Sequence, residues 1–187
     1  LTIEPGTAFH KLQSRGKLAM PADDFQLQLY KKTIKILKAS GFEHYEISNF
    51  CKLGMECRHN LNYWRNGDYF GLGAGASSYL GNTRSRNHGS AEKYIREIML
   101  KGTAVEFSEQ PGILTSMGET IMLGLRLMRG INIRQFERRF QTSFTKTYGK
   151  AIASLLKNKL ILMNDKRVSL SRKGLYLADS VILEFIH

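Results

Sequence analysis

The chain has 187 residues, of which 42% are hydrophobic, and a formal net charge of +12 at pH 7. That length and apolar content are enough for a buried core in one domain or two small ones. No apolar run approaches the roughly 18 residues that cross a bilayer and no secretory signal is present, so we expect a cytosolic protein without a transmembrane segment. Two cysteines, Cys51 and Cys57, exclude a disulfide scaffold, and their spacing fits neither a zinc knuckle nor a thioredoxin motif.

The first segments alternate strand and helix patterns. Residues 1–3 resemble the end of a strand, closed by a turn at residues 4–7; because no initiator Met precedes them, we expect the C-terminal piece of a longer protein. Asp23 or Asp24 is expected to cap a helix that runs to about Ser40. The stretch "FEHYEIS" then predicts a strand of a βα repeat.

Residues 51–68 have no clear period and are expected to form a loop, which contains "HNLNYW". The glycine-rich stretch "YFGLGAGASSYL", residues 69–80, predicts a further strand, and Ser90 is expected to cap a helix over residues 91–101. This order of elements predicts an α/β fold in which residues 1–106 are the C-terminal part of a partial (β/α) barrel.

A boundary is expected within residues 103–112, where polar residues and a Pro-Gly pair interrupt the periodic segments. Helices are then predicted over residues 116–129, after Asn132 and from Phe144, followed by a hairpin that turns at residues 164–166 and a last helix capped by Ser171. This order predicts a small winged-helix-like α+β domain over residues 107–187.

The basic charge suits phosphate or carboxylate partners, but no block of five like charges occurs, so a solvated basic surface explains it equally well. A DNA reader would concentrate polar and basic side chains on its recognition helix. The candidate helix offers only Lys146, Lys150 and Lys157. We therefore expect no nucleic-acid partner and keep a basic nucleic-acid-binding module as the least favoured hypothesis.

Gly71, Gly73 and Gly75 form G-x-G-x-G, whereas a dinucleotide fingerprint requires G-x-G-x-x-G at the start of a helix. We exclude that type of nucleotide site. The glycines would instead let a strand lie close to a ligand or to a packed neighbour.

The "HNLNYW" stretch combines groups that suit a porphyrin. No second His or carboxylate stands at metal-ligand spacing from His59, which disfavours zinc, whereas a porphyrin iron needs one axial imidazole. Tyr63 and Trp64 could stack on the macrocycle, Asn60 and Asn62 could orient the imidazole, and neighbouring arginines could meet carboxylates. The alternative to a haem site is a structural role, in which Trp64 anchors the loop to the barrel and His59 and Asn60 fix the loop backbone.

Four stretches carry a family resemblance: "LTIEPGTAF", "HYEISNF", "CRHNLNYWRNGDYFGLGAGASSYL" and "SRKGLYLADSVILEFI". In this order they resemble the C-terminal half of oxygen-independent coproporphyrinogen III oxidase-like proteins, a radical S-adenosylmethionine (radical SAM) family. The resemblance implies a [4Fe-4S] cluster and S-adenosylmethionine in the full-length protein. It also implies that Glu4, Gly71, Gly73 and Gly75 lie near the S-adenosylmethionine.

The element H-N-x-x-Y-W resembles the mark of the haem chaperone branch of this family. It implies a haem site made by His59, Asn60, Tyr63 and Trp64, with His59 on the iron, and delivery of haem to acceptor proteins that the sequence does not identify. The alternative within the family is a true oxidase, which decarboxylates two propionates of coproporphyrinogen III.

Two departures from the family pattern limit what can be transferred. The C-x3-C-x2-C motif that holds the cluster is absent from this chain, and Ser77 stands where relatives often have His. An open half-barrel would also expose a strand edge and apolar surface, so we expect the chain to self-associate.

Overall fold

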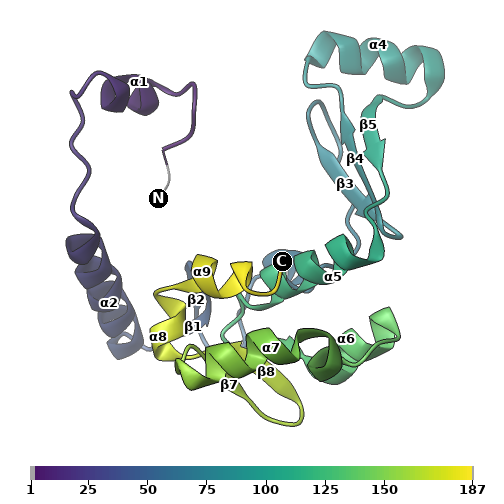
Figure 1. Ribbon diagram of the computed structural model, residues 1–187. Helices are drawn as coiled ribbons and strands as arrows, with labels where there is room; N and C mark the ends of the chain where they lie inside the picture. The colour runs from purple at the N-terminus through teal and green to yellow at the C-terminus, as the bar shows by residue number, and fades with distance from the viewer. Residues whose placement is uncertain (1–2, 187) are drawn as a thin grey trace. The chain divides into compact units, whose positions relative to one another are not determined.

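A computed structural model describes residues 3–186 of the chain (Figure 1). Its contacts divide it into two compact units, one up to Gly41 and one from Phe42 onward, which are described separately. The first unit contains the helices α1 (Ala8–Ser14) and α2 (Asp23–Ala39), and none of its described residues is buried. The sequence did not predict α1. The turn at residues 4–7 is confirmed by a 2.8 Å hydrogen bond from Thr7 Oγ1 to the Glu4 carbonyl, whereas the strand end falls largely on residues 1 and 2, outside the described residues.

Helix α2 confirms the predicted helix but not its predicted cap. Ala22 occupies the N-cap position without a side-chain hydrogen bond, and Asp23 and Asp24 lie in the first turn instead. Carboxylates there interact favourably with the positive end of the helix dipole. The helix ends before Ser40, and Gly41 adopts the left-handed conformation that ends many helices.

The second unit begins with strands β1 (Glu43–Glu46) and β2 (Asn49–Cys51). The strand in "FEHYEIS" therefore forms, but it pairs antiparallel with β2 in a hairpin, and the prediction of a βα repeat was wrong here. The turn itself explains this pairing, because the Glu46 carboxylate accepts hydrogen bonds from the Ser48 backbone N–H and the Asn49 carboxamide. A tight turn of this kind joins antiparallel neighbours, whereas parallel strands need a long crossover.

Helix α3 (Arg58–Trp64) occupies the middle of the segment predicted as a loop, so that prediction was wrong. Its N-cap residue, Cys57, makes no side-chain cap hydrogen bond, so the usual sequence mark of a helix start is missing. The helix packs against α5 (Ile113–Gly124).

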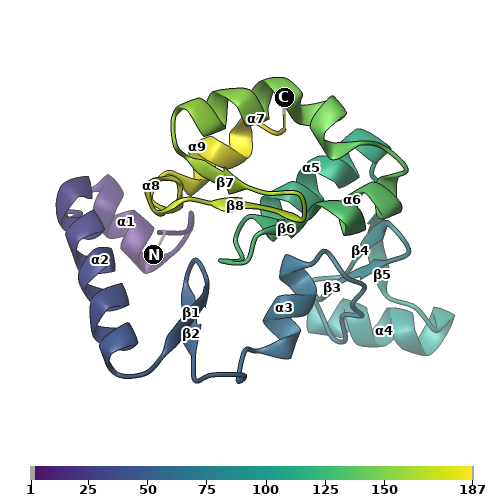
Figure 2. The same ribbon diagram turned by 90° about the horizontal axis from the view of Figure 1, so that it is seen from below.

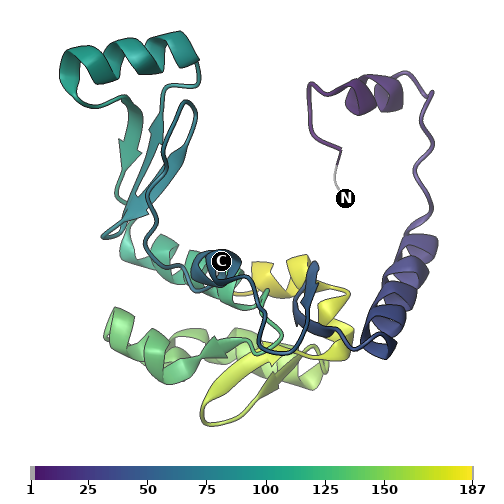
Figure 3. The same ribbon diagram turned by 180° about the vertical axis from the view of Figure 1, so that it is seen from behind.

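A three-stranded antiparallel sheet follows, with β4 (Thr83–Asn87) between β3 (Ser77–Leu80) and β5 (Val105–Glu109). Helix α4 (Ala91–Lys101) connects β4 to β5 and starts at the predicted Ser90 cap. Figure 3 shows this sheet projecting from the start of α5 with α4 at its far end. The predicted strand over residues 69–80 is confirmed only at its end, and β5 lies where an interdomain boundary was expected. The division at residues 106 and 107 stays a prediction.

The C-terminal part has the predicted order of three helices, a hairpin wing and closing helices, although one predicted closing helix is two short ones. Asn132 and Ser171 cap helices as predicted, while α5 ends at Gly124, earlier than expected. A three-stranded sheet of order β6-β8-β7 packs with these helices, and α7 runs along β7 (Figure 2). The elements after α5 are β6 (Ile131–Asn132), α6 (Ile133–Phe140), α7 (Phe144–Lys157), β7 (Ile161–Met163), β8 (Arg167–Leu170), α8 (Arg172–Leu175) and α9 (Ala178–Leu183).

This C-terminal part contains the apolar core, in which Ile121, Leu125, Phe144 and Val168 are fully buried. In contrast, α4 and β5 expose apolar side chains, among them Met99 and Phe107. The self-association expected from exposed apolar surface stays a prediction. Across residues 3–186, no helix combines the length and the apolar character needed to cross a bilayer.

Candidate functional site

Helix α3 presents two opposite faces. Successive helical residues are ~100° apart, so His59 and Tyr63 lie on one side, and Leu61, Trp64 and Arg65 lie on the other. On the first side, the His59 and Tyr63 rings are nearly perpendicular with their centroids 4.6 Å apart, and Tyr63 and Tyr69 meet at the same distance. The structure therefore brings His59 and Tyr63 together as the sequence predicted, and adds Tyr69.

The His59 imidazole is exposed, and within residues 3–186 neither of its nitrogens has a hydrogen-bond partner. An imidazole nitrogen with its lone pair free can coordinate a metal. The predicted orientation of this ring by two Asn side chains was wrong. The Asn60 carboxamide lies 3.3 Å from the Tyr45 hydroxyl and links α3 to β1, while Asn62 donates to the Asp68 carbonyl at 2.8 Å.

Trp64 is half-buried and points away from His59. The Arg126 guanidinium lies 4.6 Å from the centre of the Trp64 ring, a cation–π contact. Tyr63 and Trp64 therefore do not face one common ring plane beside His59. The position of Trp64 agrees with the alternative in which it anchors this segment to the rest of the fold.

A cavity of about 380 Å³ lies on the Trp64 side of α3, between this helix and the C-terminal part. Its apolar surface includes Leu61, Leu127 and Phe136. Four arginines and one carboxylate also line it: Arg65, Arg129, Arg139, Arg167 and Glu56. The sequence analysis did not predict this cavity. The closest indication was the spread of basic residues along the second half of the chain.

The backbone of Gly130, which lines the cavity, lies very close to strand β8. It has a φ of 62°, and a Cβ at this position would lie 2.0 Å from the Val168 carbonyl oxygen. Only glycine fits both the left-handed backbone and this contact. Helix α6 and the wing are thereby held close enough to form one side of the cavity.

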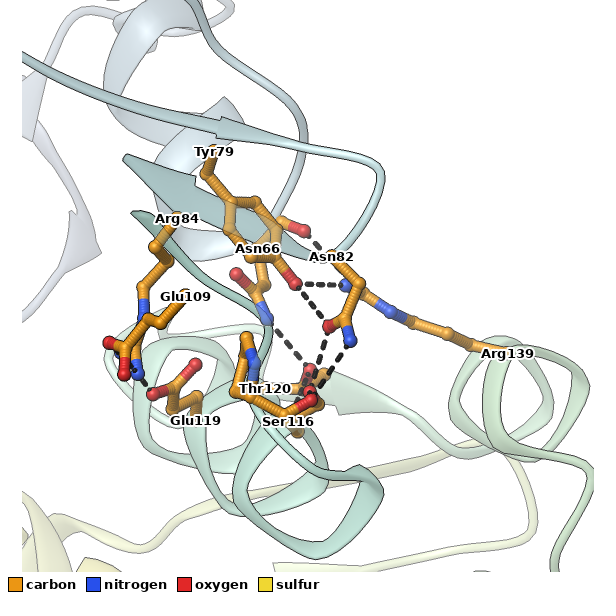
Figure 4. Close-up of polar contacts among 10 residues, drawn as sticks. Asn66, Tyr79, Asn82, Arg84, Glu109, Ser116, Glu119, Thr120 and Arg139 are labelled. Carbon is orange, nitrogen blue, oxygen red and sulfur yellow. Dashed lines mark hydrogen bonds and ion pairs between the residues drawn. The ribbon is translucent and has the colours of Figure 1, made fainter. Parts of the chain in front are cut away.

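A polar network connects the turn between β3 and β4 with α5 and α6 (Figure 4). Arg139 donates to the Tyr79 hydroxyl at 3.0 Å and to the Asn66 carbonyl at 2.8 Å. The Tyr79 hydroxyl donates to the Asn82 side-chain oxygen, which also accepts from Ser116 Oγ at 2.8 Å. Because the Arg139 side chain also lines the cavity, the network fixes one of the cavity's charges.

The three glycines predicted to lie in a strand are in a loop instead. Gly73 and Gly75 have φ angles of 103° and 71°, and a Cβ on Gly71 would lie 2.2 Å from the Ser77 carbonyl oxygen. The Asn87 side chain donates to the carbonyls of Gly71 and Gly73. The glycines thus permit the loop to pack closely on the sheet that follows it. Ser77, the first residue of that sheet, is exposed. Glu4 belongs to the other unit, so its predicted proximity to these glycines stays a prediction.

The cysteines of this chain do not fit an iron–sulfur cluster. A radical SAM cluster of the C-x3-C-x2-C type uses three thiolates, and the chain has only Cys51, which is buried, and Cys57, which is exposed. Burial raises the pKa of the Cys51 thiol, and the carboxylates of Glu56 and Glu43 raise it further. Among the described residues, no group of three or more His, Cys, Asp or Glu is arranged to hold a metal ion.

Comparisons with known proteins bear on the family. The sequence model of the HemN C-terminal domain matches residues 115–177. The heme chaperone HemW of Lactococcus lactis is 36% identical over 186 residues, which cover 100% of this chain and 48% of the relative. The heme chaperone HemW of Bacillus subtilis is 34% identical, with 100% and 49% covered. Radical S-adenosyl methionine domain-containing protein 1, mitochondrial, of Danio rerio is 30% identical, with 97% and 45% covered.

The chain thus spans about half the length of the curated relatives that it matches. Among solved structures, coproporphyrinogen III oxidase (HemN) from Escherichia coli matches with a TM-score of 0.70 over 92% of this chain and 44% of that one. At 17% identity, this match establishes the shared α/β fold alone. The HemN C-terminal domain match and the relatives that align along the whole chain show that the chain corresponds to the C-terminal half of the oxygen-independent coproporphyrinogen III oxidase-like radical SAM family, as the resemblance indicated.

Proposed function

We propose that the chain is part of a protein that binds haem and delivers it to acceptor proteins. The observation that carries this proposal is the 34–36% identity, along the whole chain, to proteins named heme chaperone HemW. The alternative of a true coproporphyrinogen III oxidase is supported by the HemN C-terminal domain match over residues 115–177 and by a shared fold at 17% identity, neither of which extends along the whole chain at comparable identity. In the full-length protein, the [4Fe-4S] cluster would be held by residues outside this chain.

The proposed iron ligand is His59. Its exposed imidazole has no competing hydrogen bond within the described residues, and its ring packs nearly perpendicular to that of Tyr63. Coordination by one imidazole requires only a nitrogen lone pair directed at the iron. An exposed helix face also lets a ligand as large as haem bind and leave, as delivery to an acceptor demands.

The other predicted site residues take different places in this proposal. Asn60 links α3 to β1 through its hydrogen bond to Tyr45. Trp64 attaches α3 to the rest of the fold through its contact with Arg126 and does not cover the haem. Proximity of Glu4, Gly71, Gly73 and Gly75 to S-adenosylmethionine is a proposal for the full-length protein. We also keep the cytosol as the proposed location and expect no nucleic-acid partner.

A hemin titration followed at the Soret band tests the role of His59. His59→Ala should abolish the Soret shift that the unaltered chain gives, and should leave the thermal midpoint nearly unchanged because the side chain is exposed. His10→Ala, which removes a His from the first unit, is the matched control and should titrate like the unaltered chain.

Two outcomes would contradict this assignment. An unchanged Soret titration in folded His59→Ala would remove the residue from the haem site. A midpoint lowered by about 2–4 °C or more with hemin binding intact would instead assign His59 a structural role, since that shift corresponds to roughly 1 kcal/mol in a chain of this size.

A further inference from the structure

The cavity on the Trp64 side of α3 contains hydrogen-bond donors that the fold leaves unused. Trp64 lines the cavity, and its indole N–H is buried without a hydrogen-bond partner in the described part of the chain. The side chains of Arg65 and Gln135, which also line the cavity, make no hydrogen bond or ion pair with residues 3–186. The Arg65 and Gln135 side chains are exposed, so a ligand in the cavity can accept hydrogen bonds from them directly, whereas the Trp64 N–H would have to shift to reach a ligand.

The charges around the cavity favour an anion. Four arginines line it, and its one carboxylate, Glu56, already lies 3.4 Å from a guanidinium nitrogen of Arg129. Two further arginines donate to the protein itself, Arg139 to Tyr79 and Asn66, and Arg167 to backbone carbonyls. Arg65 is therefore the cation that remains available to a ligand. Its planar guanidinium matches a carboxylate with two parallel hydrogen bonds.

The cavity lining is mixed, and its apolar part indicates which kind of anion fits. Leu61, Leu127 and Phe136 offer no hydrogen bonds to an ion such as phosphate, but they can contact a hydrocarbon group attached to a charged one. A volume of about 380 Å³ lies at the lower end of the range of small-molecule pockets, roughly 300–1,000 Å³. We propose that this cavity binds a small ligand that joins an apolar body to a carboxylate, with the carboxylate on Arg65 and the body against Phe136 and Leu61.

This site is separate from the proposed iron ligand, because His59 and Tyr63 lie on the opposite face of α3 and do not line the cavity. The inference therefore does not rest on haem binding at His59. The two can be tested apart, since His59→Ala should leave the cavity and its donors intact.

Trp64 provides the readout, because it is the one tryptophan of the chain. The probe is 3-phenylpropionate, followed by Trp64 fluorescence and by calorimetry, and its uncharged analogue is 3-phenylpropanamide. The acid should bind saturably, the amide at least tenfold more weakly, and His59→Ala should bind the acid like the unaltered chain. Arg65→Gln should weaken binding of the acid at least fivefold while leaving the amide unchanged.

Arg58→Gln is the matched control, since Arg58 is exposed on the same helix and does not line the cavity. It should bind the acid with unchanged affinity, and circular dichroism should show that each variant is folded. The inference is overturned if the acid does not bind saturably, if acid and amide bind equally, or if Arg58→Gln loses as much affinity as Arg65→Gln.

Discussion

Two regions of the second unit are held together by different forces. Every residue of the buried apolar cluster found among the described residues lies between Met117 and Phe185, in the C-terminal region (residues 113–186). The hairpin region (residues 42–109) buries few apolar side chains, such as Tyr79, and several of its buried residues are polar, such as Glu46 and Asn66. The hydrophobic effect therefore stabilises the C-terminal region directly.

The hairpin region depends on contacts with its neighbour. Backbone hydrogen bonds from Ile47 to Arg126 and from Met128 to Tyr45 attach the first hairpin, and Arg139 attaches the turn between β3 and β4. The difference teaches that the candidate site, which includes α3, is shaped by polar attachment to a rigid core. Loss of the core should therefore disorder both regions, whereas loss of an attachment should loosen only one.

The largest effect is expected from Phe136→Ala. Phe136 is 2% exposed and packs on Phe140 and Phe144, so truncation leaves a cavity in the core and should cost about 3–5 kcal/mol of unfolding free energy. Urea denaturation followed by circular dichroism measures this change. The matched control is Phe107→Ala in β5, where the side chain is 47% exposed and the change should stay within about 0.5 kcal/mol.

Hydrogen exchange on the same variant tests the dependence between the regions. Phe136→Ala should lower amide protection in β3 and β4 together with α7. If β3 and β4 kept their protection while the C-terminal helices lost theirs, the hairpin region would be independently stable and the comparison would be wrong.

A smaller and more local effect is expected from Arg139→Ala. The change leaves the Tyr79 hydroxyl and the Asn66 carbonyl without this donor, and should cost about 1–3 kcal/mol. Combination with Tyr79→Phe in a double-mutant cycle should give a coupling energy of roughly 1 kcal/mol. Amide exchange should accelerate in β3 and β4 but not in α7.

Arg138→Ala is the control for this cycle, because Arg138 is exposed and its side chain makes no hydrogen bond or ion pair within the described residues. It should change the unfolding free energy by less than about 0.5 kcal/mol. A coupling energy near zero between Arg139 and Tyr79 would mean that the network does not attach the hairpin region.

The same contrast explains which parts of the fold could be predicted from the sequence. In the C-terminal region, buried side chains recur at helical spacing, and Asn132 and Ser171 make the cap hydrogen bonds that their residue types indicate. In the hairpin region, the N-cap residue of α3, Cys57, makes no side-chain cap hydrogen bond, and all five residues of β5 are exposed, so the apolar side chains of Val105 and Phe107 do not mark a buried face. Apolar periodicity in a sequence reflects which side chains are buried, and few side chains of the hairpin region are buried.

The candidate site was predictable only in part for the same reason. His59 and Tyr63 are neighbours because they are four positions apart on a helix, which the sequence did not announce. The separation of Trp64 from His59 follows once α3 is known to be a helix. The contact of Trp64 with Arg126 and the cavity beside it arise from residues far apart in the chain, which no local pattern brings together.

The smallest expected effect concerns the two thiols of the hairpin region. Cys57 is exposed, whereas Cys51 is 7% exposed in β2 and burial raises its pKa, so it has less of the reactive thiolate at a given pH. A chromogenic disulfide reagent should therefore label Cys57 fast and Cys51 only when the pairing of β1 with β2 opens.

Because the folded-state pKa of Cys51 is raised, its thiol holds its proton more tightly in the folded chain than in the unfolded chain. The stability that this group contributes is complete below the ordinary thiol pKa and is lost as the pH rises through the folded pKa. The slow labelling phase should thus quicken with pH more steeply than the fast phase, and Cys57→Ser should remove the fast phase alone. Two equal rates in the folded chain would show that the first hairpin opens freely, and its backbone attachment to residues 126–128 would then contribute little.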